Sequence, residues 1–86
     1  MMNNRVYVVR GAIDEQKIPS IYTADAEMAQ DEFLQLANIN VDYVYIEDAN
    51  TGEVYAYFEL VRDEWGTTVS RGVSREFTEI LAGLRE

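Results

Sequence analysis

Apolar and polar residues alternate over two neighbouring stretches in the middle of the chain, and a period of two predicts β-strands. The strands run from about Val41 to Asp48 and from Glu53 to Arg62. A loop of three residues, with Gly52 in the left-handed position of a type I turn and G1 bulge, keeps odd-numbered residues opposite odd-numbered ones. The predicted hairpin therefore pairs Glu47 with Tyr55, Tyr45 with Tyr57 and Tyr43 with Glu59.

The two faces of this hairpin differ in chemistry. The even-numbered face is apolar and is expected to form the core beneath a helix. It consists of Val44, Ile46, Val54, Ala56, Phe58 and Leu60. The odd-numbered face combines tyrosines with glutamates, and we expect Tyr7 of an earlier strand to extend it. Because an unpaired buried carboxylate is costly, the glutamates indicate that this face meets water.

The residues before the hairpin predict one strand and one helix. RVYVVRG, residues 5–11, alternates and is rich in valine and tyrosine, which favours a strand. Segment 12–22 is expected to be a connection, because Pro19 breaks regular elements.

The predicted helix spans residues 23–38. Thr23 or Asp25 is expected to cap its first turn, and Asn38 and Asn40 mark its end. Its apolar stripe consists of Ala26, Ala29, Phe33, Leu36 and Ala37. The alanines allow the helix backbone to approach a sheet closely.

The residues after the hairpin predict a turn and a final helix. Trp65 lies in the turn, and it is either a second contact for a partner or, as is commoner for a lone tryptophan, part of the core. Segment 67–73 is either a short fourth strand or an extended connection. Ser74 can cap a helix over residues 74–86. The apolar stripe of that helix is Phe77, Ile80, Leu81 and Leu84.

The order of these elements, β-α-β-β-(β)-α, predicts an α+β fold with two layers. We expect an antiparallel sheet with one main helix packed on one face, and a C-terminal helix whose position the sequence leaves open. A chain of 86 residues is the size of one domain, so residues 1–86 are expected to form a single domain.

The amino-acid composition restricts the chemistry. The chain has no histidine and no cysteine, which removes histidine-based catalytic triads, thiolate nucleophiles and the usual zinc ligands. We therefore expect a protein that is not an enzyme, with no catalytic residues, no metal and no cofactor. No apolar run approaches the ~20 residues that span a membrane. A cytoplasmic location is expected, the host cytoplasm if a phage encodes the protein.

Negative charge is concentrated in the middle of the chain. The formal charge is −9, and between Ile18 and Val61 there are nine acidic residues and no lysine or arginine. Such a surface could serve solubility alone. Against this, Glu27 and Asp31 lie four apart on the predicted helix, where like charges cost roughly 0.2–0.5 kcal/mol. Direct nucleic-acid binding is disfavoured, and a protein partner with a basic surface is favoured.

We expect the tyrosine and acidic residues to form a partner-binding surface, because tyrosine is enriched at interfaces. The candidate residues are Tyr43, Tyr45, Tyr55, Tyr57, Glu47, Glu59, Asp31 and Glu32. Three alternatives stay open. The tyrosines could only stabilise the hairpin through cross-strand pairs. The C-terminal helix could cover them. They could also form the seam of a homodimer in a small structural or regulatory protein.

In architecture the chain resembles the small anti-CRISPR proteins of phages and other mobile elements. The resemblance covers residues 5–60, with the strand RVYVVRG, the helix TADAEMAQDEFLQLA and the hairpin VYIEDANTGEVYAYF in a short acidic chain. It implies a stoichiometric, non-catalytic inhibitor that occupies a nucleic-acid or partner surface of a nuclease complex such as a CRISPR effector. Several proteins of that kind act as DNA mimics.

Overall fold

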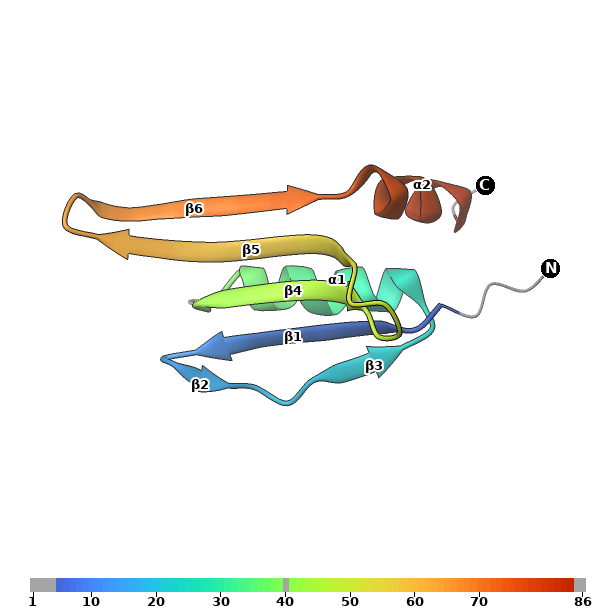
Figure 1. The fold of residues 1–86 in the computed structure, drawn as a ribbon, viewed down its shortest axis with the longest axis horizontal. Coiled ribbons are helices and arrows are strands. Elements are labelled where there is room, and N and C mark those ends of the chain that lie inside the picture. Colours follow the sequence, from blue (N-terminus) through green and yellow to red (C-terminus); the bar gives the residue numbers. More distant parts are fainter. Residues whose placement is uncertain (1–4, 40, 85–86) are drawn as a thin grey trace.

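The computed structural model describes residues 5–39 and 41–84, which form an antiparallel sheet and two helices (Figure 1). The strand order is β2-β1-β4-β5-β6, and β3 pairs with the other half of β1, on the same edge as β2. The elements are β1 (Tyr7–Ile13), β2 (Gln16–Lys17), β3 (Ile21–Thr23), α1 (Ala26–Ala37), β4 (Tyr43–Asp48), β5 (Val54–Asp63), β6 (Gly66–Val73) and α2 (Arg75–Leu84). The predicted α+β architecture is confirmed.

Helix α1 begins directly after its N-cap residue, Asp25. The Asp25 carboxylate accepts hydrogen bonds from two backbone N–H groups of the first turn, at 2.9 and 3.3 Å. The Thr23 hydroxyl accepts from the N–H of Asp25 itself, at 3.0 Å, so the two predicted capping residues act in series. Asn38 is the C-cap, and Asn40 lies outside the described residues.

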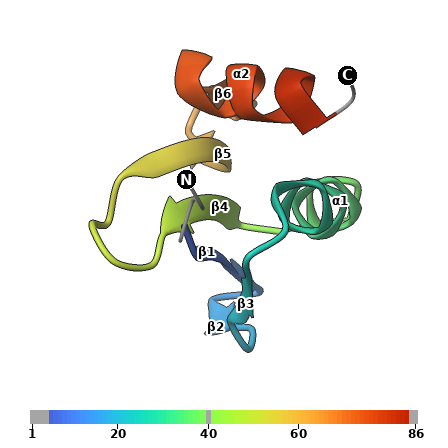
Figure 2. The ribbon, with the colours of Figure 1, turned by 90° about the vertical axis from the view of Figure 1, so that its right-hand side faces the viewer.

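Helix α1 lies on one face of the sheet, and α2 follows the end of β6 and packs into the core on that side (Figure 2). Ala26 and Ala29 of α1 are buried with Val44 and Ile46 of β4, as the predicted stripe required. Helix α2 adds Phe77 to the same core. The opposite face, which we call the open face, has no described helix over it. Antiparallel sheets can be solvated in this way on one side.

Helix α2 is therefore not a cover for the tyrosines of the open face. Ser74 caps it as expected, since its hydroxyl accepts from the N–H of Phe77 at 3.1 Å. Phe77 and Leu81 are buried and Ile80 packs against the core. The side chain of Leu84 lies outside the described part of the chain, as do residues 85–86.

The hairpin register is correct at two pairs and wrong at the third. Tyr43 lies opposite Glu59 and Tyr45 opposite Tyr57, as predicted. A bulge between Ile46 and Glu47 then shifts the register, so Glu47 faces Val54 instead of Tyr55. The bulge exchanges the faces of the sheet to which Val54 and Tyr55 point, so that Val54 is 42% exposed and Tyr55 only 2%. Gly52 has the expected positive φ of 79° in the loop.

Tyr7 also lies in the core, at 3% exposure, and not on the open face. It is opposite Asp48 in the pairing of β1 with β4, and Asp48 is in the even-numbered, helix-facing set. The rings of Tyr7 and Tyr55 have centroids 5.4 Å apart, and Phe77 lies 5.8 Å from Tyr7. The register of β1 against β4, which was not part of the prediction, decides this position.

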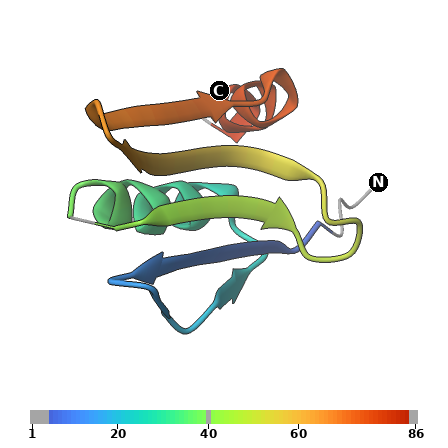
Figure 3. The ribbon, with the colours of Figure 1, turned by 60° about the vertical axis from the view of Figure 1, so that its left-hand side comes forward.

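Segment 12–22 is more regular than predicted. It contains β2 and β3, which both pair with β1 and flank Pro19 (Figure 3). The turn into β2 consists of Asp14 and Glu15, both with positive φ, 51° and 69°. These angles are those of a type I′ turn, the connection that matches strand twist in a two-residue hairpin.

Segment 67–73 is part of a strand, β6, and not an extended connection. β6 pairs with β5 from Gly66 to Val73 without a break. The distal end of this ribbon, residues 60–69, projects beyond α1, as Figure 1 shows. We call it the arm. Trp65 lies in its turn and is 88% exposed, so it is not part of the core.

Candidate functional site

The open face carries three of the four predicted hairpin tyrosines. Tyr43 and Tyr45, two residues apart on β4, have ring centroids 5.3 Å apart with the planes tilted by 40°. Tyr57 lies opposite Tyr45 on β5. All three side chains are half-buried. Part of each side chain is thus accessible while its position is held by neighbours.

A glycine on β6 makes room for Tyr57. Gly72 is opposite Tyr57, and a Cβ built on Gly72 would lie 2.8 Å from the ring. No Cβ contact in a folded protein is that short, so the ring lies over the bare backbone of Gly72. The residue type at position 72 therefore sets where the Tyr57 ring can lie.

Tyr45 is fixed by a hydrogen bond to the diagonal neighbour on the next strand. Its hydroxyl donates to the Glu59 carboxylate. This bond, with partial burial of the ring, raises the pKa of Tyr45 to about 12. A phenol that donates to a carboxylate is held in its neutral form.

Charges on the open face nearly balance. The Arg10 guanidinium of β1 lies 2.8 Å from the Glu47 carboxylate, and Glu59 is occupied by Tyr45. Lys17 of β2 is close to the same face and takes part in no ion pair among the described residues. The open face is therefore aromatic and mixed in charge, and it is not the uniformly acidic surface that we expected.

Two hollows lie on either side of Tyr45. The first, about 320 Å³, is lined by Tyr43, Tyr45, Arg10, Lys17 and Ser20 and is the more polar. The second, about 560 Å³, is lined by Tyr45, Tyr57, Glu59, Gly72 and Val54 among others. Tyr45 therefore forms a ridge between two hollows, a shape against which a complementary protein surface can pack.

The fourth hairpin tyrosine, Tyr55, is not available to a partner. Its hydroxyl donates to Asp48 at 2.9 Å, and its ring stacks on Phe77 with centroids 5.6 Å apart. Its position on the open face was predicted wrongly because the bulge turns it toward the helices. Burial together with the bond to Asp48 raises the pKa of Tyr55.

Asp31 and Glu32 lie on α1, across the sheet from the tyrosines. Asp31 is exposed and Glu32 half-buried, and neither takes part in an ion pair within the described residues. A partner that covers the open face would not touch them. The eight predicted site residues therefore divide into an open-face group, one core residue and two helix residues.

Sequence reasoning missed three contributors to the open face. Arg10 and Lys17 supply its cations, and Tyr22 of β3 is opposite Val8, itself opposite Glu47, which places it on the same side. Tyr22 is the most accessible tyrosine of this face, 66% exposed. Alternation in RVYVVRG puts Arg10 on the face opposite Tyr7, so the pairing of β1 with β4 was needed to place it, and residues 17 and 22 fall in the predicted connection.

The described residues offer no other evident chemistry. Among them, no three potential metal ligands lie close enough together to hold an ion. The two helices that they form are too short or too polar to cross a bilayer. Comparisons with models of protein families, with curated proteins and with solved structures found no match to this chain.

Proposed function

We propose that this protein is a non-catalytic inhibitor or adaptor that binds a partner protein through the open face. One observation carries the proposal. Tyr43, Tyr45 and Tyr57 are held by specific contacts on a sheet face that no described helix covers. Tyrosine presents a large and rigid surface at low entropic cost, and it is enriched where protein interfaces concentrate their binding energy.

The partner presents a basic surface of the kind that binds nucleic acid. The charge of −9 makes the protein an anion at long range, which accelerates association with a positive partner. In this scheme the helix carboxylates Asp31 and Glu32 act through the field and the open face makes the contact. A CRISPR effector complex from the same host is the partner class that the anti-CRISPR resemblance suggests.

Competition with DNA tests this proposal. Purified effector complexes are bound to labelled duplex DNA, and the protein is titrated into each complex while the bound DNA is followed by electrophoretic mobility. We expect stoichiometric release of DNA from one complex, with a lower apparent affinity at high salt because surface charges are screened. No catalytic turnover is expected, so the end point depends on the molar ratio alone.

Paired variants separate the open face from the rest of the surface. Tyr45→Ala should weaken the release of DNA about 30-fold, since truncating a tyrosine hot spot costs about 2 kcal/mol. Met28→Ala removes an exposed apolar side chain from α1 and should change nothing. Equal effects of the two substitutions, or no release from any complex, would refute the proposal.

A further inference from the structure

The arm is an exposed part of the fold that does not pack into the protein's own core. Every residue from Val61 to Thr68 is exposed, and over this stretch the ribbon consists of β5 and β6 alone, because the pairing of β5 with β4 ends before it. An isolated two-stranded ribbon is marginal in water. The arm nevertheless pairs along its full length and ends in the exposed Trp65.

β6 is also an unprotected edge strand (Figure 3). Natural edge strands are usually protected by lysine, proline, bulges or a covering segment. β6 reads GTTVSRGV, with a single charge at Arg71, no proline and no break in its pairing with β5. Nothing in these eight residues opposes the addition of another strand.

The backbone groups that face outward can be identified. The N–H of Ser74 donates to the carbonyl of Tyr55 at 2.7 Å, so the residue pair 55 and 74 is hydrogen-bonded across the ribbon. Such pairs alternate in antiparallel strands. The even-numbered residues of β6 thus bond to β5. The odd-numbered residues direct N–H and C=O to the free edge; they are Thr67, Val69, Arg71 and Val73.

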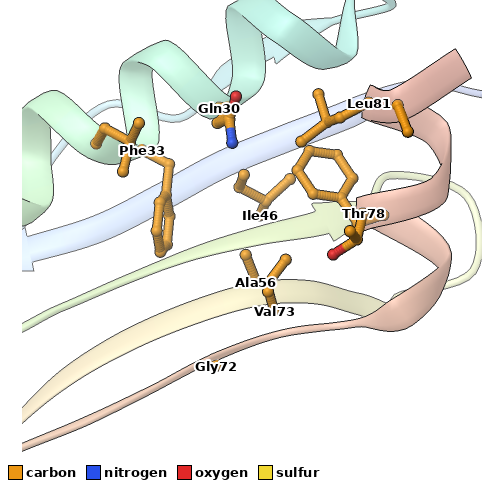
Figure 4. A pocket seen from close by; sticks show the side chains of 11 residues that line it. Gln30, Phe33, Ile46, Ala56, Gly72, Val73, Thr78 and Leu81 are labelled. Atoms are coloured by element: carbon orange, nitrogen blue, oxygen red, sulfur yellow. The ribbon is translucent and has the colours of Figure 1, made fainter. Parts of the chain in front are cut away.

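An apolar groove lies beside the same strand, on the helix side of the sheet. Figure 4 shows Phe33 of α1, Ile46 of β4 and Leu81 of α2 around a cavity of about 390 Å³. A second cavity of about 400 Å³ continues it along α1 and shares Phe33, Leu34, Gly72 and Val73. Val73 is 57% exposed at the edge of this groove.

We propose that a second copy of the chain pairs with β6 and covers the mouth of this groove. The two β6 strands run antiparallel around a two-fold axis at Val69, so that Val69 of each copy bonds to Val69 of the other. This axis preserves the faces of the sheet, because residues opposite each other then have the same parity. Arg71 lies opposite Thr67 of the second copy, and the two arginines stay apart.

The same register brings the exposed Trp65 close to the second copy. With Val69 opposite Val69, residue 65 of one copy lies opposite residue 73 of the other. Trp65 lies in the turn just before β6 and is exposed, next to the position where this register brings Val73 of the second copy. Its indole then covers Val73 at the mouth of the groove of the second copy. One arrangement accounts for the free edge and covers both the exposed Trp65 and the mouth of the groove.

Charge favours this part of the molecule for self-association. Residues 61–75 contain three arginines and two acids, whereas the acid-rich segment lies elsewhere. Two copies that meet through their arms keep the carboxylates of the acid-rich segment apart. Since each copy still carries −9, screening by salt should strengthen the dimer. The partner contact of the open face should respond to salt in the opposite direction.

The test follows mass and tryptophan fluorescence together. Light scattering from micromolar to millimolar protein should show a rise to twice the monomer mass. Trp65 is the only tryptophan, so its emission should shift to the blue over the same concentration range. Val69→Pro should remain monomeric, because proline removes an outward N–H but no bond to β5. Val69→Thr keeps that N–H and should dimerise normally.

A second pair of variants tests the tryptophan. Trp65→Ala should raise the concentration of half-dimerisation about 30-fold, the effect of truncating a tryptophan hot spot worth about 2 kcal/mol. Tyr22→Ala, an exposed aromatic at the other edge of the sheet, should leave it unchanged. A constant monomer with exposed tryptophan emission would overturn the proposal. So would a dimer that survives Val69→Pro and is broken by Tyr45→Asp on the open face.

Discussion

The hydroxyl of Tyr55 donates a hydrogen bond of 2.9 Å to Asp48, the buried carboxylate of the described core. The same carboxylate accepts the backbone N–H groups of Asn50 and Thr51, at 2.8 and 3.0 Å, in the loop that follows β4. Asp48 therefore ties the hairpin loop to the ring that the bulge turns inward. These bonds lower the pKa of Asp48, the bond from Tyr55 contributing most.

Asp48→Asn should destabilise the protein by about 1–3 kcal/mol at neutral pH, the usual cost of disturbing a buried, hydrogen-bonded charge. Tyr55→Phe should cost a similar amount, because it removes one donor to the carboxylate. Tyr22→Phe, which removes an exposed hydroxyl, should stay within about 0.5 kcal/mol of the parent. Urea unfolding of the four proteins measures these differences.

The cost of Asp48→Asn should depend on pH. Because the folded pKa lies below the unfolded value of about 3.9, the carboxylate stabilises the fold above that pH and ceases to do so as pH falls through the folded pKa. The gap between the parent and Asp48→Asn should therefore narrow below about pH 4. A gap that is the same at neutral and acid pH would contradict this role for Asp48.

Gly72→Ala should displace the Tyr57 ring. The new Cβ would meet that ring at 2.8 Å, and the resulting overpacking should cost roughly 1–3 kcal/mol. Gly83→Ala is the matched control, because no atom lies within 4 Å of its Cβ and alanine favours a helix by about 0.5–1 kcal/mol. Thermal unfolding should move in opposite directions for the two variants. Equal shifts would show that Tyr57 does not depend on Gly72.

Tyr45 should ionise later than an ordinary tyrosine. Its pKa of about 12 exceeds the unfolded value of about 10, so its contribution to stability is complete below pH 10 and is lost as pH rises toward 12. Absorbance titration of the parent and of Tyr45→Phe gives this pKa by difference. Glu59→Gln should lower it, because the amide carries no charge. An unchanged titration in Glu59→Gln would contradict the bond.

The sequence predicted the elements whose pattern is local. These elements depend on residues that are near each other in the sequence. They are the cap at Asp25, the alanine-lined helix, the cap at Ser74 and the hairpin pairs of Tyr43 with Glu59 and Tyr45 with Tyr57. The α+β class follows from these elements and their order. For the open face, alternation correctly placed Tyr43, Tyr45 and Tyr57.

Contacts between distant segments could not be predicted in the same way. Tyr7 faces the helices because β1 pairs with β4 in one register, and nothing in RVYVVRG specifies it. Tyr55 turns inward because a bulge is stabilised by Asp48 and Phe77, seven and twenty-two positions away in the sequence. Charge alone associates Asp31 with the tyrosines, and charge carries no information about which side of the sheet a helix covers.

Site-specific photo-cross-linking tests the central claim, contact through the open face, most directly. A benzophenone amino acid replaces Tyr22 on the open face or Asp31 on α1, both of them exposed positions on opposite sides of the sheet. Each variant is irradiated with the effector complex that the parent protein displaces from DNA. We expect a covalent adduct from position 22 and little or none from position 31. An adduct from position 31 alone would contradict the claim and assign the contact to the acidic helix.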